Sequence, residues 1–226
     1  MFITLEGPDG SGKSTQISPL AEYLRDHGFK VVVTREPGGT DISNQVREVI
    51  MKMKNTAMHP RTEILLFLAA RAQLVEEVIR PHLLQGEIVL CDRYADSTIA
   101  YQGYGHGTDL PGLHQLVDFA TGGLKPDLTI LFDIDVEDGL KRRQIGGGEW
   151  NRLDDYQLAF HQRVRNGYLE MVKAEPDRWE MLNANQSKDQ VKSTLIDIVN
   201  TRVIRFMELR ETQPSQSPSE LKGRIN

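Results

Sequence analysis

With 226 residues, 39% of them hydrophobic, the chain is long enough for a sizeable buried core, and we expect one domain. A formal net charge of -5 offers no broad basic face for a nucleic-acid backbone, and no apolar run is long enough to cross a bilayer, so we expect neither a nucleic-acid nor a membrane partner. A single cysteine excludes an internal disulfide, and together with the lack of a signal-like segment at the N-terminus it favours a cytoplasmic location.

Five short apolar runs predict β-strands. They lack the alternation of a strand with one wet face, which indicates burial on both sides and hence a parallel sheet. The five runs are Phe2–Leu5, Lys30–Thr34, Glu87–Cys91, Leu128–Asp133 and Arg178–Leu182.

Helical patterns separate these runs, and particular residues mark where helices begin and end. Gly28 is a typical stop for the first helix, and Pro60 is a typical first residue for a long helix that reaches about Leu84. Asp109 indicates another start, and a further helix is expected from about Leu153. Strands that alternate with helices predict an α/β fold with a five-stranded parallel sheet flanked by helices.

The segment after the first strand reads GPDGSGKS and has the spacing of a P-loop. Its glycines let the backbone wrap a phosphate and direct N–H groups at it. Lys13 can then reach the β- and γ-phosphates, and the Ser14 hydroxyl can coordinate Mg²⁺. The pattern predicts a P-loop NTPase fold that binds a nucleoside triphosphate with magnesium. The expected contacts are Gly7, Pro8, Asp9, Gly10, Ser11, Gly12, Lys13, Ser14 and Thr15.

Charged residues follow the second and third predicted strands. The second strand runs into Arg35 and Glu36, and the third runs into Asp92 and Arg93. Ligands of parallel sheets collect at the carboxyl ends of the strands, so we expect these side chains to face the nucleotide. Asp92 is also an expected ligand of Mg²⁺ or of its bound water.

Four segments beside the P-loop carry a family resemblance. TREPGGT begins at Thr34, LLFLAARAQL at Leu65 and DRYADSTIAYQG at Asp92, and an arginine-rich stretch spans 140–154. Together they resemble the thymidylate kinases, in their bacterial form, over residues 2 to about 200. The resemblance implies a fold like that of the nucleoside monophosphate kinases and Mg²⁺-dependent transfer of the γ-phosphoryl group of ATP to dTMP.

The resemblance assigns several residues to the nucleoside of dTMP. Phe67 would stack on thymine, although without the resemblance the apolar run around it favours a place in the core. Arg71 would donate to the O4 carbonyl, and Ser97 and Gln102 would hydrogen-bond the base. Tyr101 would pack against the 2′ position of the sugar and disfavour ribose.

Further residues are assigned to the sugar hydroxyl and the phosphate. Asp9 would accept from the 3′-hydroxyl, with Glu36 as a supporting carboxylate beside it. Arg93 would hold the 5′-phosphate, and Arg47 would be a second phosphate contact.

Residues 141–153 predict a mobile lid, because three consecutive glycines interrupt a basic stretch. Arg142, Arg143 and Arg152 could reach the transferring phosphoryl group, and a solvated basic loop is the alternative. Asp9 is followed by Gly10, so the P-loop lacks the arginine that one branch of the family carries there. That lack favours a catalytic arginine in the lid, and which of the three serves stays open.

The end of the chain yields two expectations. Asn183 and Ala184 follow the fifth strand and resemble the family's turn beside adenine. Residues 208–226 are polar and carry no periodic apolar residues, so we expect the kinase-like domain to span 1–207 and the rest to be a disordered tail.

The sequence therefore predicts a dTMP kinase that uses ATP and Mg²⁺. A kinase of another nucleoside monophosphate, such as dUMP or dGMP, and a P-loop protein that binds nucleotide without phosphorylating it remain alternatives. The family resemblance also implies a homodimer, for which the apolar faces around Val46–Met53 and Ile64–Val78 could form the interface.

Overall fold

The structure is a computed structural model that describes residues 1–146 and 152–212. Its five strands form one parallel sheet in the order β2-β3-β1-β4-β5, so the predicted sheet is confirmed. The strands are β1 (Phe2–Glu6), β2 (Val31–Arg35), β3 (Ile88–Asp92), β4 (Leu128–Asp133) and β5 (Trp179–Asn183).

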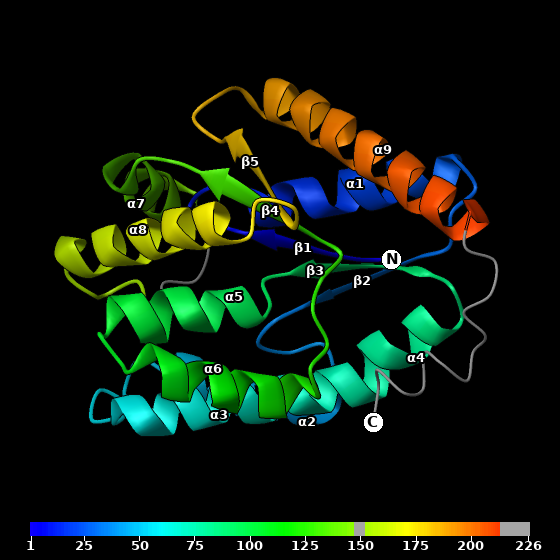
Figure 1. Ribbon diagram of the computed structural model, residues 1–226. Coiled ribbons are helices and arrows are strands. Elements are labelled where there is room, and N and C mark those ends of the chain that lie inside the picture. Colours follow the sequence, from blue (N-terminus) through cyan, green and yellow to red (C-terminus); the bar gives the residue numbers. More distant parts are fainter. Residues whose placement is uncertain (147–151, 213–226) are drawn as a thin grey trace.

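Helices cover both faces of the sheet, with α1 and α9 on one face and α3, α6 and α8 on the other (Figure 1). Two π-helical segments, Val75–Ile79 and Ile99–Gly105, continue α3 and α5 respectively. The helices are α1 (Lys13–Asp26), α2 (Asp41–Met51), α3 (Pro60–Leu74), α4 (Arg80–Leu84), α5 (Ala95–Thr98), α6 (Leu110–Thr121), α7 (Val136–Ile145), α8 (Leu158–Ala174) and α9 (Lys188–Thr212).

β1 is the middle strand of the parallel sheet. All five residues of β1 are buried, because β3 and β4 flank the strand and helices cover its two faces. Leu5 pairs with Asp92 of β3 and with Ile130 of β4, so the residues that follow these strands emerge at one edge. The P-loop comes directly after β1 and therefore lies in the middle of that edge.

The predicted helix starts are confirmed with one exception. Pro60 opens a helical stretch that runs to Leu84 through the π-helical segment, and the Asp109 carboxylate caps α6 by accepting from the N–H of Gly112 at 2.8 Å. The start expected near Leu153 is wrong, because α8 begins at Leu158. The residues before it form a turn, in which polar side chains bind other parts of the chain instead of continuing a helix.

Helix α9 is longer than the sequence indicated. Val191, Leu195, Val199 and Val203 are buried four residues apart against the sheet and anchor the helix along its length. The helix continues to Thr212, so the expected change to a tail at 208 comes too early. Residues 213–226 lie outside the part of the chain that the structure describes, as do 147–151 of the expected lid. Within the described residues, no helix combines the length and apolar character needed to span a membrane.

Candidate active site

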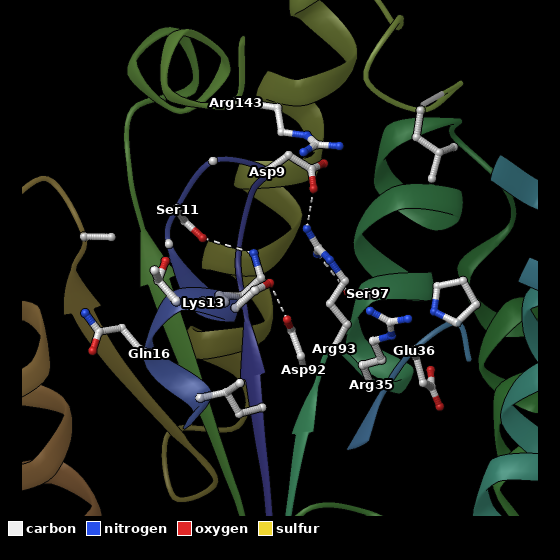
Figure 2. A pocket seen from close by; sticks show the side chains of 18 of the residues that line it. Asp9, Ser11, Lys13, Gln16, Arg35, Glu36, Asp92, Arg93, Ser97 and Arg143 are labelled. Atoms are coloured by element: carbon white, nitrogen blue, oxygen red, sulfur yellow. Dashed lines mark hydrogen bonds and ion pairs between the residues drawn. The ribbon is translucent and has the colours of Figure 1, made fainter. Parts of the chain in front are cut away.

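A cavity of about 1290 Å³ opens at the carboxyl edge of the sheet. It is lined by the P-loop, the ends of β2 and β3, parts of α3 and of the π-helical segment after α5, the end of α7 and the loop after β5. Lys13 lies at its centre, with Arg93 on one side and Gln16 on the other (Figure 2). The cavity is large enough for two small ligands on either side of the P-loop.

The P-loop has the shape that its glycines predict. A Cβ on Gly7 would lie 2.5 Å from the carbonyl oxygen of Phe132, and one on Gly10 would lie 1.9 Å from that of Gly139. Both glycines also have positive φ angles, of 140° and 75°. Helix α1 starts at Lys13, so its N-terminal amides face the enclosed space, as anion binding requires.

The Lys13 ammonium group lies inside the loop. Its Nζ donates to the carbonyl oxygens of Gly7 at 2.9 Å and Pro8 at 3.0 Å, and to Ser11 Oγ at 3.0 Å. Burial, reinforced by the charge of Arg93, lowers the pKa of Lys13 to about 8. An anionic phosphate at this position would favour the charged ammonium form.

Ser14 and Asp92 meet beside the lysine. The Ser14 hydroxyl donates to Asp92 Oδ2 at 2.5 Å. A hydroxyl and a carboxylate are hard oxygen ligands, which suit Mg²⁺, an ion that takes few protein ligands and keeps phosphate and water oxygens as the rest. The side chains present therefore fit the expected magnesium position.

Asp9, Arg93 and Tyr101 form a polar cluster on the β3 side of the cavity. Arg93 Nη2 donates to Asp9 Oδ1 at 2.7 Å, and the Tyr101 hydroxyl donates to Asp9 Oδ2 at 2.6 Å. Burial alone would raise the pKa of Asp9, but the charges of Arg93 and Lys13 lower it to about 2. Arg93 adopts a φ of 68°, unusual for a residue with a Cβ, and its guanidinium lies 5.0 Å from the Tyr101 ring centroid.

Arg71 is buried deeper in the same cavity. Its Nε donates to Glu36 Oε2 at 2.8 Å, its Nη1 to Thr98 Oγ1 at 2.9 Å and its Nη2 to the carbonyl oxygen of Tyr94 at 3.0 Å. Burial raises the pKa of Glu36, although the Arg71 charge opposes that change. Only 1% of Arg71 is exposed, so its guanidinium is held rigidly in one orientation.

Gln102 also lines the cavity and is almost fully buried. Its Nε2 donates to Glu63 Oε1 at 2.7 Å. Its Oε1 is buried and has no hydrogen-bond partner within the described part of the chain. A buried carbonyl oxygen without a donor is costly unless a ligand supplies one.

A model of the thymidylate kinase family matches residues 5–195. The chain belongs to the thymidylate kinase family. A thymidylate kinase of Roseiflexus sp. (strain RS-1) is 51% identical over 210 residues, covering 88% of this chain and 93% of the relative. A thymidylate kinase of Roseiflexus castenholzii is 52% identical over 221 residues, covering 92% and 96%. The crystal structure of thymidylate kinase from Ehrlichia chaffeensis matches with a TM-score of 0.73 at 36% identity, covering 88% of this chain and 98% of that one.

The thymidylate kinase resemblance named residues that the structure gathers in the cavity. Phe67 is half-buried and lines the cavity, so it is not a core residue of α3. Arg47 lines it too and donates to the carbonyl oxygen of Pro37 at 3.0 Å. Arg71, Arg93 and Tyr101 line the cavity as well.

Two residues expected on the dTMP side have different neighbours from those implied. Ser97 lines the cavity, but its hydroxyl donates to Glu6 Oε2 at 2.7 Å and accepts from Arg93 Nη1 at 3.1 Å, so it supports Arg93. Glu36 pairs with Arg71 rather than lying beside Asp9, and Figure 2 shows the two carboxylates on opposite sides of Arg93. The hydrogen-bond partners of Ser97 and Glu36 could not be deduced from their spacing along the chain.

The three arginines of the expected lid bind different partners. Arg142 lines the cavity and donates to the carbonyl oxygen of Ala184 at 2.8 Å and to Asn185 Oδ1 at 3.0 Å. Arg143 lines it as well and forms two hydrogen bonds to Asp154, at 3.2 and 3.0 Å. Figure 2 shows Arg143 next to Asp9.

Arg152, the third arginine of the expected lid, does not line the cavity. It is 8% exposed, and its Nη2 donates to Glu63 Oε2 at 2.5 Å. Its Nε donates to the carbonyl oxygen of Ile50 at 3.2 Å and its Nη1 to the Tyr156 hydroxyl at 3.0 Å. The buried Glu63 carboxylate therefore holds Arg152 in place.

The two residues expected beside adenine lie at the end of β5 and in the loop that follows, and only one of them lines the cavity. Ala184 lines the cavity, whereas Asn183 is exposed and its Oδ1 accepts from the N–H of Asn185 at 2.8 Å. Asn183 therefore shapes the turn and does not face the cavity. The residues 186–188 that follow line the cavity instead.

The sequence analysis assigned no role to Thr98 and Gln16, and it expected Arg35 to face the nucleotide without assigning it a contact. Arg35 points into the cavity (Figure 2), and within the described residues nothing forms a hydrogen bond or ion pair with its guanidinium. It directly precedes Glu36 at the end of β2, and this charged strand end was the signal that indicated its position. Thr98 binds Arg71, and Gln16 binds the carbonyl oxygen of Lys188 at 2.9 Å; neither carries a sequence signal of its own.

Proposed function

We propose that this chain transfers the γ-phosphoryl group of ATP to dTMP and gives dTDP, with Mg²⁺ as cofactor. The observation that carries the proposal is one cavity that joins a phosphate-binding P-loop to a pocket with the polarity of a thymidine nucleotide. Membership of the thymidylate kinase family supports the same reaction.

The acceptor base would lie between Phe67, Arg71 and Gln102. Arg71 Nη1 carries two N–H groups and gives one to Thr98, which leaves one for the O4 carbonyl of thymine. The unpartnered Oε1 of Gln102 would accept from the neighbouring N3–H. The Phe67 ring offers a flat apolar face for stacking.

The sugar and phosphate of the acceptor would lie over Asp9 and Arg93. Asp9 is ionised at neutral pH and can accept from the 3′-hydroxyl, and the Tyr101 ring beside it would meet the 2′ position. Arg93 would hold the 5′-phosphate, with Arg35 and Arg47 as further donors at the β2 end. These contacts would hold the acceptor oxygen in line with the donor phosphate.

The donor would occupy the P-loop and the α7 side of the cavity. Lys13 and the amides at the start of α1 would hold the β- and γ-phosphates. Ser14 and Asp92 would hold Mg²⁺, which neutralises charge on the phosphate oxygens when bound. Arg142 and Ala184 would flank the adenine, and Arg143 would approach the transferring group.

A coupled assay for ADP release, run with and without dTMP, tests this proposal. ADP release that depends on dTMP is the expected result. ADP release with dUMP or dGMP but not dTMP would indicate a kinase of another nucleotide. Nucleotide binding without transfer to any monophosphate would indicate a non-catalytic regulator.

We also propose a homodimer, formed through α2, α3 and α6. The adjoining faces of these helices expose apolar side chains, and Phe119 of α6 is 89% exposed. Exposed apolar side chains on three neighbouring helices suit a second copy of the chain. The exposed residues are Ile42, Val49, Met53, Leu65, Leu116 and Phe119. Sedimentation of the wild type against Phe119→Glu tests it, and a wild-type monomer would contradict it.

The single buried cysteine agrees with the proposed cytoplasmic location.

A further inference from the structure

Glu63 is a buried carboxylate of α3 that binds both Gln102 and Arg152. Only 1% of its side chain is exposed. Its Oε1 accepts from Gln102 Nε2 at 2.7 Å and from His106 Nε2 at 3.2 Å, and its Oε2 accepts from Arg152 and Tyr156. Burial alone would raise the pKa of Glu63, but hydrogen bonds from His106, Gln102 and Arg152 lower it to about 2. The carboxylate is therefore ionised at any pH at which the protein is used.

An ionised carboxylate can only accept hydrogen bonds, and this fixes the Gln102 amide. If the amide were reversed, its carbonyl oxygen would face Glu63 Oε1 at the same short distance, and two acceptors would repel each other. The NH₂ group of Gln102 must therefore face Glu63. Its Oε1 is then directed away from Glu63, and Gln102 lines the cavity that Phe67 and Arg71 also line.

We propose that Glu63 is a positioning residue for base selectivity, because it makes Gln102 present an acceptor to the acceptor base. This inference rests on the proposed dTMP kinase function and deepens it. Thymine and uracil carry an N–H at position 3 and satisfy that acceptor. Cytosine carries a lone pair there, so its complex leaves two acceptors facing each other in a buried site.

The two oxygens of Glu63 divide their partners in a way that permits a clean test. Oε1 binds Gln102, whereas Oε2 binds Arg152. Removing the Arg152 side chain removes an ion pair but leaves the Gln102 contact. Replacing the carboxylate with an amide lets residue 63 donate as well as accept, which allows the Gln102 amide to turn over.

The experiment measures kcat/KM for dTMP and for dCMP in three folded variants. Glu63→Gln is expected to lower the dTMP to dCMP ratio by about tenfold, with the rest of the preference kept by Arg71. The double variant Glu63→Gln with Arg152→Met removes both buried charges, serves if the single variant unfolds, and is expected to show the same fall. Arg152→Met alone is the control and is expected to lose stability while keeping the ratio within about threefold.

A merely structural role for Glu63 would lower both kcat/KM values together and leave their ratio unchanged. An unchanged ratio in either folded variant that carries Glu63→Gln overturns the inference. A wild-type enzyme that fails to phosphorylate dTMP overturns the proposed function instead, so the two failures are distinguishable.

Discussion

The Ser14 hydroxyl donates to the Asp92 carboxylate at 2.5 Å, which joins the P-loop after β1 to the carboxyl end of β3. If this pair holds Mg²⁺, Ser14→Ala should raise the Mg²⁺ concentration needed for half-maximal rate by about tenfold. Excess Mg²⁺ should recover part of the rate. Thr201→Ala, which removes a hydroxyl on the surface of α9, is the control. An unchanged Mg²⁺ requirement in Ser14→Ala would remove Ser14 from the metal site.

Lys13→Ala should reduce transfer to every acceptor by more than about tenfold. The Lys13 ammonium group lies inside the loop that would hold the donor phosphates, so its loss removes charge neutralisation whichever monophosphate is bound. The measurement is the rate of ADP release with dTMP and dUMP at saturating ATP. Activity within tenfold of the wild type would contradict the P-loop assignment.

Arg93→Ala should lose dTMP turnover while it keeps ATP binding. Arg93 lies on the β3 side of the P-loop, and its guanidinium donates to Asp9, Tyr101 and Ser97, the first two of which are expected to meet the sugar of dTMP. We expect kcat/KM for dTMP to fall by about a hundredfold or more. ATP binding, measured with a fluorescent ATP analogue, should change by less than about threefold. Normal dTMP turnover would show that another residue, such as Arg35, holds the acceptor phosphate.

The sheet could be predicted from sequence because its signals are local. Runs such as the valines of β2 are apolar on both faces, and the P-loop spacing marks the strand before it and the helix after it. The turn before α8 could not be predicted, because Arg152 is held by Glu63, which lies 89 residues earlier in the chain. The length of α9 was underestimated because composition after 207 looks polar, whereas buried residues further back anchor the helix.

The candidate site shows the same limit. Positions beside strand ends, such as Lys13 and Arg93, could be named because the chain places them at the carboxyl edge whatever their partners. The hydrogen-bond partners of the side chains in the site could not be inferred. Ser97 accepts from Arg93 and donates to Glu6, whereas Thr98 accepts from Arg71, because adjacent residues on a helix point in different directions.

The lid arginines should separate by measurement into two classes. Arg143→Met should lower kcat by about tenfold or more, because Arg143 lines the cavity next to Asp9. It should also cost some stability, because it leaves the buried Asp154 carboxylate without two hydrogen bonds. Arg152→Met should destabilise the fold by about 3 kcal/mol, because it leaves the buried Glu63 carboxylate without its charged partner. Thermal melts and steady-state kinetics of the two variants provide the test. A stable Arg152→Met protein with a collapsed kcat would return Arg152 to the phosphoryl group.

Glu6 should make stability fall as pH rises. Burial, with repulsion from Asp96, raises the pKa of Glu6 from 4.5 to about 7. The folded protein therefore binds a proton that the unfolded chain releases between these values, and the free energy of unfolding falls as pH rises through that window, by up to about 1.4 kcal/mol per pH unit. Glu6→Gln resembles the protonated form, so it should match the wild type near pH 4.5 and exceed its stability at pH 8.

Urea unfolding of the wild type and Glu6→Gln at intervals from about pH 5 to pH 8 measures this difference. Asp9→Asn is the control, because the pKa of Asp9 is lowered from 3.8 to about 2. Its ionised form contributes stability that is complete above its unfolded pKa and is lost only as pH falls through the folded value. The gap between wild type and Asp9→Asn should therefore stay constant over the range, while the gap to Glu6→Gln widens with pH. Parallel curves for both variants would show that Glu6 does not titrate near neutrality.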